Sequence, residues 1–100
     1  KIDYQNLAKT TNKGKAVKLT GYITGTESRG GEWVTTFALS KSGETYKQIV
    51  YAISSEEPPF AVGTQAVLYG TASEAYSVLV EGGTIQNFPR VEVAFYEQVN

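Results

Sequence analysis

The side chains that most enzymes use for catalysis are missing from this sequence. It has no cysteine and no histidine, which removes thiolate nucleophiles, imidazole bases, Ser-His-Asp triads and zinc-finger ligands. Carboxylates remain, but Glu56 and Glu57 are adjacent, so in an extended segment they diverge rather than flank one bond. Asp3 is the only aspartate, and no acidic cluster resembles a calcium loop. We therefore expect no catalytic residue, no metal site and no cofactor, and predict that the protein is not an enzyme.

A group of aromatic and basic residues could instead bind a ligand through ring stacking. Aromatic rings stack on bases or sugar rings, and neighbouring Arg and Lys side chains can meet phosphates. The candidate ligand-binding residues are Arg29, Trp33, Lys41, Lys47 and Tyr51. A core role stays open for both aromatics, because Trp33 shares a strand face with Phe37, and Tyr51 shares one with Ile49.

The charge of the chain argues against a nucleic-acid partner. Its net charge is −1 and its pI is about 5.4, whereas proteins that bind single strands need a basic groove. Residues 1–50 hold eight basic and four acidic side chains, and residues 51–100 hold one basic and six acidic side chains. A patch around Arg29, Lys41 and Lys47 predicts only weak binding of single strands, lost at physiological salt.

Alternation of apolar and polar residues predicts a series of short strands. The predicted strands are 16–23, 32–40, 46–53, 65–71, 76–80 and 91–96. Glycine-rich turns join several of them, and Pro58-Pro59 takes the chain out of the sheet. Residues 1–15 should form a short helix and a turn. The fold class is therefore all-β, with five or six antiparallel strands in a barrel, and the 100 residues suffice for one domain over 1–100.

An eight-residue pattern occurs twice, and it places a glycine on the inward face of a strand. The two copies are Gly14-x-x-Val17-x-Leu19-x-Gly21 and Gly63-x-x-Ala66-x-Leu68-x-Gly70. An inward glycine marks a strongly coiled strand or a close backbone approach. The predicted core consists of the apolar phase of the strands: Val17, Leu19, Ile23, Phe37, Leu39, Ile49, Leu68 and Val93.

These motifs resemble the oligonucleotide/oligosaccharide-binding (OB) fold, and more narrowly small OB-like domains of exported proteins and lipoproteins of Gram-positive bacteria. In those domains a short helix precedes G-K-x-V-x-(L/F)-x-G, and a G-D-x-V-x-V-Y-G strand follows later. A Tyr, a Gly-Gly turn and a Pro lead to their last strand, as Tyr76, Gly82-Gly83 and Pro89 do here. The resemblance spans residues 3–97, and it departs at Thr64, where the family has Asp, and at 73–75, which lack a glycine.

The resemblance implies a non-catalytic binding or structural module that is extracellular or at the cell surface, with an unidentified protein or glycan partner. A cytoplasmic location is the alternative. OB folds bind oligomers on the face of strands 2 and 3 and the loops that join strands 1–2 and 4–5, a surface that here carries the five candidate residues. The second hypothesis is therefore a binder of single-stranded nucleic acid or oligosaccharide on that face. No apolar run approaches the length of a membrane span.

Overall fold

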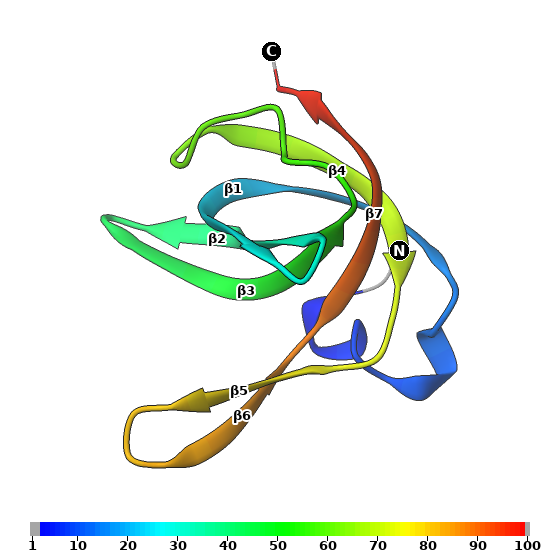
Figure 1. Cartoon of the computed structure of the whole chain (residues 1–100), viewed down its shortest axis with the longest axis vertical. Helices are drawn as coiled ribbons and strands as arrows, with labels where there is room; N and C mark the ends of the chain where they lie inside the picture. Colours follow the sequence, from blue (N-terminus) through cyan, green and yellow to red (C-terminus); the bar gives the residue numbers. More distant parts are fainter. Residues whose placement is uncertain (1–2, 100) are drawn as a thin grey trace.

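The computed structural model of the protein describes residues 3–99, which are almost entirely strands and turns (Figure 1). Two single 3-10 turns, η1 (Tyr4–Asn6) and η2 (Thr10–Asn12), precede the strands. The strands are β1 (Ala16–Arg29), β2 (Glu32–Ser42), β3 (Thr45–Ser54), β4 (Gln65–Ala72), β5 (Tyr76–Val80), β6 (Thr84–Phe88) and β7 (Arg90–Gln98). The predicted all-β class is confirmed, and the predicted N-terminal helix is reduced to these two turns.

Five of the strands close into a barrel in the order β1-β2-β3-β7-β4. Neighbouring strands are antiparallel, as predicted, except that β3 and β7 are parallel. The β3–β7 contact is short and joins Tyr51 to Arg90, Ala52 to Val91 and Ile53 to Glu92. The parallel pair arises because β7 runs antiparallel to β4 and then closes the barrel against β3. This arrangement confirms the predicted OB-like barrel.

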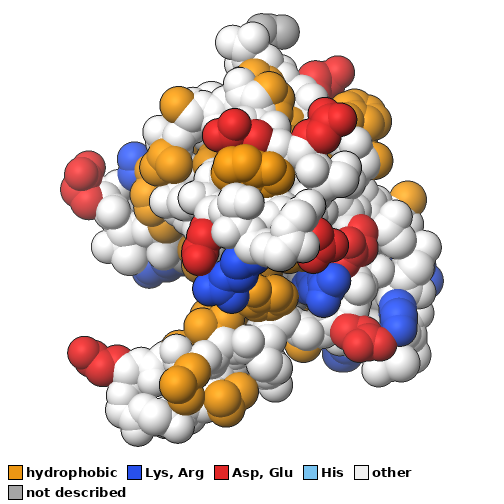
Figure 2. All heavy atoms as spheres, in the orientation of Figure 1, with side chains coloured by type: hydrophobic (Ala, Val, Ile, Leu, Met, Phe, Trp, Pro, Cys, Tyr) orange, Lys and Arg blue, Asp and Glu red, His pale blue; other side chains and the backbone are white. Residues whose placement is uncertain are grey.

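The other two strands, β5 and β6, form a hairpin that stands apart from the barrel (Figure 1). The hairpin is inserted between β4 and β7 and turns through Gly82 and Gly83, whose φ angles of 91° and 81° favour glycine. Within residues 3–99, its strands pair only with each other. In Figure 2 it lies at the bottom of the view, separated from the barrel by a deep notch.

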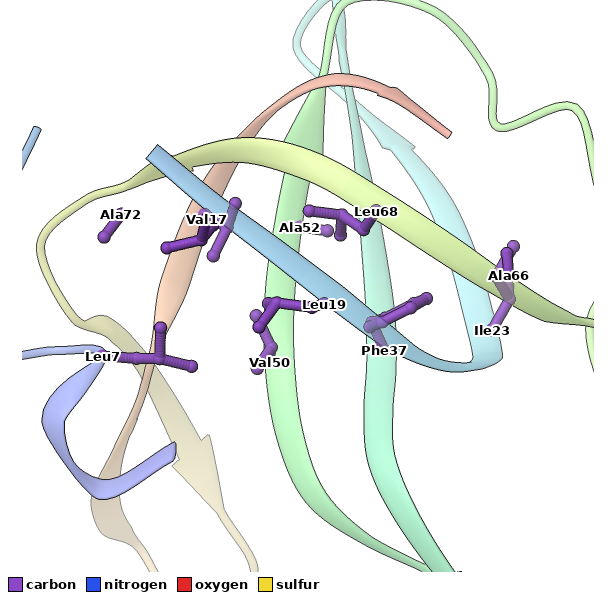
Figure 3. Packing of buried hydrophobic residues seen from close by; sticks show 11 residues of the cluster. Leu7, Val17, Leu19, Ile23, Phe37, Val50, Ala52, Ala66, Leu68 and Ala72 are labelled. Carbon is purple, nitrogen blue, oxygen red and sulfur yellow. The ribbon is translucent and has the colours of Figure 1, made fainter. Parts of the chain in front are cut away.

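The barrel interior holds one apolar cluster, which includes most of the predicted core (Figure 3). Five of the predicted core residues are buried: Val17, Leu19, Ile23, Phe37 and Leu68. Leu39 and Val93 are partly buried and pack against the cluster.

The prediction for Ile49 is wrong, because the inward face of β3 belongs to Val50 and Ala52. These two residues pair with Phe37 and Thr35 of β2, and directly paired residues point to the same side of a sheet. The register of β3 against β2 therefore places Ile49 and Tyr51 on the outer face.

The N-terminal turns close one end of the barrel. Leu7, which follows η1, is fully buried in the core cluster. The hydroxyl of Tyr4 donates a hydrogen bond to the backbone oxygen of Ile49 at 2.9 Å. The N–H of Gly14 donates to the backbone oxygen of Ala72 at 2.8 Å. The segment before β1 is thus an integral part of the barrel.

The two inward glycines lie where one backbone crosses closely over another, as the repeated pattern predicts. A Cβ on Gly21 would be 2.2 Å from the carbonyl oxygen of Ala38, and a Cβ on Gly70 would be 2.3 Å from that of Glu92. The two copies of the pattern also pair with each other, since Val17 faces Gly70 and Gly21 faces Ala66. The pattern therefore marks two adjoining strands that coil tightly around one core.

Two hydroxyls are buried without a hydrogen-bond partner among the residues that the structure describes, those of Thr35 and Tyr96. Burial raises the pKa of Tyr96 to about 12, because a phenolate there would lose its hydration, and the nearby Thr35 hydroxyl offsets only part of this rise. The native state therefore holds the Tyr96 proton more tightly than the unfolded chain does.

Replacing Tyr96 with Phe is expected to leave the free energy of unfolding unchanged at pH 7, or to raise it by up to about 1 kcal/mol, because an unpaired buried hydroxyl is removed. Unfolded tyrosine ionises near pH 10, so the wild type loses stability as the pH rises from about 10 to 12. At pH 12 the loss in the free energy of unfolding should be smaller in the variant than in the wild type, by on the order of 2 kcal/mol. Urea unfolding at pH 7, 10 and 11.5 tests this, and equal alkaline losses would contradict it.

Candidate ligand-binding cleft

A cleft of about 590 Å³ lies between the barrel and the β5–β6 hairpin. Four strands contribute side chains to its walls, among them Arg29 of β1, Val34 of β2, Tyr51 of β3, and Tyr76 and Leu79 of β5. Figure 2 shows it as the notch between the hairpin below and the barrel above. We call it the hairpin cleft. It lies on the outer face of β2 and β3, between the β1–β2 turn and the β5–β6 hairpin.

Local sequence explains why these side chains face the cleft. β1 and β2 pair without a break in register from Gly25–Thr36 to Arg29–Glu32, where glycines at 30 and 31 make the turn with φ angles of 55° and 87°. Tyr51 pairs with Thr36, so both lie on the outer face, opposite the buried Phe37. The cleft floor is therefore the outer face of two strands whose inner face fills the barrel.

An aromatic cluster joins the base of the hairpin to the barrel. The rings of Tyr51 and Tyr76 are stacked, with centroids 4.6 Å apart and planes 11° apart. Phe88 packs against Tyr51 at 5.2 Å in a tilted arrangement. Arg29 Nη1 donates a hydrogen bond to the Tyr76 hydroxyl at 3.2 Å. Burial raises the pKa of Tyr51.

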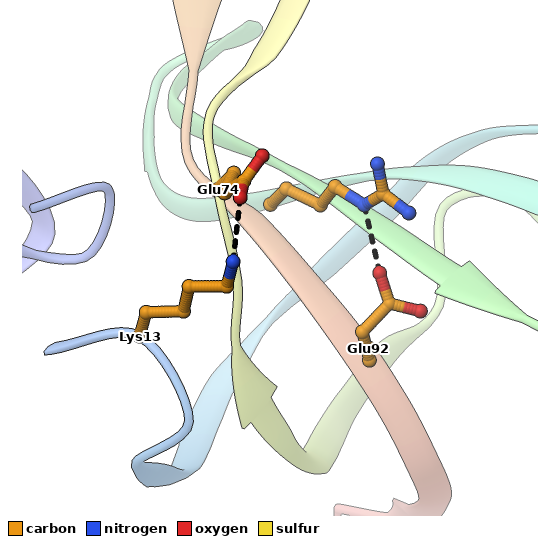
Figure 4. Close-up of polar contacts among 4 residues, drawn as sticks. Lys13, Glu74 and Glu92 are labelled. Atoms are coloured by element: carbon orange, nitrogen blue, oxygen red, sulfur yellow. Dashed lines mark hydrogen bonds and ion pairs between the residues drawn. The ribbon is translucent and has the colours of Figure 1, made fainter. Parts of the chain in front are cut away.

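The basic side chains around the cleft are paired with carboxylates. Arg29 Nε lies 3.2 Å from Glu27 Oε2, and the pair raises the pKa of Arg29. Arg90 Nε lies 2.7 Å from Glu92 Oε2 (Figure 4).

A third pair lies at the base of the hairpin. Lys13 Nζ lies 2.5 Å from Glu74 Oε1 (Figure 4), which lowers the pKa of that carboxyl. Each of the three pairs joins one basic and one acidic side chain, so none of them adds net charge.

The structure brings two of the five candidate residues into the cleft, Arg29 and Tyr51. Trp33 is half-buried and shares its strand phase with Thr35 and Phe37. The Nζ of Lys41 sits over the rings of Tyr22 and Tyr46, at 5.7 and 5.3 Å from their centroids. Lys47 is exposed and pairs with Ser40. The last three residues do not line the cleft.

Sequence reasoning missed the residues that the hairpin supplies. Tyr76 and Phe88 face each other as the first pair of the hairpin, and both reach Tyr51, which is distant in sequence. Leu79 lines the cleft and is 68% exposed. The run Val78-Leu79-Val80 is apolar at consecutive positions, so both faces of this short strand carry apolar side chains, and that is the sequence signal that could have found it.

The described residues contain neither a metal-binding cluster nor a membrane-spanning element of the helical kind. Residues 3–99 include no group of three or more His, Cys, Asp or Glu side chains placed to hold a metal ion. In the same range, none of the helical segments has the length and apolar character needed to cross a bilayer.

Comparison with known proteins bears on the fold. No family model and no curated protein matches the chain. Among solved structures, it is similar to a putative aspartyl-tRNA synthetase from Leishmania major Friedlin, with a TM-score of 0.64 and 13% sequence identity. The match covers 99% of this chain and 20% of that protein, so the domain corresponds to a small part of it. With the strand order β1-β2-β3-β7-β4, this likeness gives the chain an OB-like barrel fold.

Proposed function

We propose that the domain is a non-catalytic binding module whose hairpin cleft takes a short segment of an oligosaccharide. The observation that carries this proposal is the position of the cleft. OB folds bind oligomers on the face of their second and third strands, between the loops that join strands 1–2 and 4–5. Here the cleft lies on β2 and β3, between the β1–β2 turn and the hairpin inserted before the last barrel strand.

The chemistry of the cleft favours an uncharged ligand with ring faces and hydroxyl groups. Val34, Leu79 and Tyr76 supply apolar surface, on which the C–H face of a sugar ring can pack. The neighbouring Glu27–Arg29 pair offers an acceptor and donors to hydroxyl groups. Arg29 has five N–H groups, of which two are used among the described residues.

Single-stranded nucleic acid is the second candidate, and two observations favour it. The similar solved structure is that of a putative aspartyl-tRNA synthetase, a name that includes a nucleic acid, tRNA. Tyr51 and Tyr76 also form a stacked aromatic cluster beside Arg29, and stacking on aromatic rings is a common means of holding bases. Phosphates, however, need unpaired basic groups, and Arg29 and Arg90 are both paired with glutamates. This candidate therefore ranks below the oligosaccharide.

An extracellular or cell-surface location is part of the same proposal. It rests on the resemblance of the Gly14–Gly21 and Gly63–Gly70 motifs to exported domains, and a glycan ligand is in keeping with it. A signal peptide or lipobox in the complete reading frame would support this location, and a cytoplasmic operon partner without any export signal would count against it.

Binding to a broad array of neutral and charged glycans, with fluorescently labelled 12-nucleotide DNA and RNA single strands in parallel, tests the proposal. We expect retention of a neutral glycan at physiological salt, with affinity little changed between low and high salt. Arg29→Ala and Leu79→Ala should each weaken it roughly 5- to 10-fold, corresponding to about 1 kcal/mol.

Matched controls lie outside the cleft. Lys41→Ala removes a cation that sits over Tyr22 and Tyr46, and Phe95→Ala removes an exposed aromatic side chain on β7. Both should bind like the wild type. If the DNA or RNA single strands bind in a salt-sensitive way and Arg29→Ala weakens that binding, nucleic acid replaces the oligosaccharide as the proposed ligand. Retention of neither class, or equal losses in the controls, would overturn the proposal.

A further inference from the structure

The β5–β6 hairpin is attached to the barrel only at its base. It forms its own two-stranded sheet, and its backbone pairs only within itself among the described residues. The flanking backbone is held firmly. The Ser73 N–H donates to the Arg90 oxygen at 2.9 Å, and the Tyr51 N–H donates to the Pro89 oxygen at 2.8 Å. The freely projecting part therefore begins just beyond Ser73 and ends just before Pro89.

Side-chain contacts hold the base of the hairpin against the barrel. Tyr76 stacks on Tyr51, Phe88 packs against the same ring, and Arg29 donates to the Tyr76 hydroxyl. The ring of Tyr51 is thus already occupied by the hairpin, which makes Tyr51 a positioning residue rather than an open stacking platform. Such contacts can be broken and remade without disturbing the sheet of the barrel.

The hairpin beyond its base presents apolar side chains to solvent. Leu79 and Ile85 are a directly opposed pair on one face of the hairpin, and they are 68% and 59% exposed. Leu79 also lines the cleft. The face that Tyr76 turns toward the barrel also carries Val78, which lines the cleft and is half-buried, so closing of the hairpin would bring Val78 onto a bound molecule.

We propose that the β5–β6 hairpin is a hinged arm that closes over the ligand in the cleft. Tyr51 sets the angle of the arm at its base, and Val78, which lines the cleft and shares the hairpin face of Tyr76, belongs to the surface that closes on the ligand. The closing of the arm on a ligand rests on the proposed function. The motion of the arm does not, because it is a property of the free domain and can be measured without any ligand.

Double electron–electron resonance between two spin labels measures the arm directly. The chain has no cysteine, so Glu44→Cys and Glu81→Cys, both in exposed turns, place labels on the barrel and on the arm. Glu44→Cys with Thr71→Cys, both exposed barrel positions, is the control pair. We expect a broader distance distribution for the arm pair than for the barrel pair.

Tyr51→Ala should broaden the arm distribution at least twofold and leave the barrel pair unchanged, whereas Tyr51→Phe should behave as the wild type because the ring is kept. If Tyr51→Ala does not fold, which the barrel pair reports, Tyr76→Ala takes its place with the same expectation. An arm distribution as narrow as that of the barrel, and unmoved by these variants, would overturn the proposal.

A glycan retained on the array should shorten the mean distance of the arm pair. If a glycan binds and the distance does not change, the arm is refuted while the binding function stands. If no probe binds but Tyr51→Ala still broadens the distribution, the arm stands and the proposed function fails.

Discussion

Gly21→Val and Gly70→Val are each expected to lower the free energy of unfolding by about 3 kcal/mol, the upper end of the usual cost of overpacking. The reason is the atom that a side chain would meet. A Cβ at either position would lie within 2.2 to 2.3 Å of a backbone carbonyl oxygen, that of Ala38 or Glu92. A carbonyl oxygen in a paired strand cannot rotate away, so the strands themselves would have to separate.

Urea unfolding at pH 7 measures this loss, and Gly25→Val is the matched control. A Cβ on Gly25 would lie 2.9 Å from Thr36 Oγ1, which is a side-chain atom that can turn aside. The control should therefore cost clearly less than the other two substitutions. Unchanged unfolding midpoints for Gly21→Val and Gly70→Val would show that the close crossings are not required by the barrel.

Leu7→Ala is expected to cost about 2–4 kcal/mol, because it leaves a cavity where a fully buried side chain closes the barrel. The residue lies outside every strand, between η1 and η2. A large loss would therefore show that the N-terminal segment is part of the folding unit.

Leu79→Ala is the control for this prediction, because the same side chain at position 79 is 68% exposed. It should change stability by less than about 0.5 kcal/mol. Thermal and urea unfolding of both variants give the comparison. A cost for Leu7→Ala no greater than that of Leu79→Ala would mean that the N-terminal turns only rest on the barrel.

Much of the barrel could be predicted from the sequence, because its strands alternate cleanly. Val17, Leu19 and Leu68 lie on the phase that alternation assigns to the core. In β3 both phases are apolar, with Ile49, Tyr51 and Ile53 on one and Val50 and Ala52 on the other. Alternation cannot decide such a strand. Which face of β3 is buried is set by its pairing with Phe37 and Thr35 of β2, and this pairing is a tertiary contact.

The ends of elements were harder to predict than their existence. The segment 25–31 contains three glycines and predicts a loop, yet β1 continues to Arg29 because Gly25–Arg29 pair with β2. The helical turns near Tyr4 are single 3-10 turns. Their position depends on Leu7, which enters a barrel built from residues further along the chain.

The candidate site could be predicted only where it lies on the barrel. Arg29 and Tyr51 were found from residue type and from the face that OB folds use. Tyr76 and Phe88 reach Tyr51 because the base of the hairpin packs against β3. No local sequence pattern predicts the orientation of a hairpin relative to the rest of the domain. The charge of Lys41 predicts a place in the site, but its Nζ lies instead over the rings of Tyr22 and Tyr46.

The most direct test of the binding proposal is ¹H–¹⁵N chemical-shift mapping of the wild-type domain with the neutral glycan that the array retains best. The largest shifts are expected in the amides of Arg29, Val34 and Leu79, which line the hairpin cleft, with little change at Lys41 or Phe95. Shifts centred on Lys41 or on Phe95, with the cleft amides unmoved, would contradict the assignment of the hairpin cleft as the binding site.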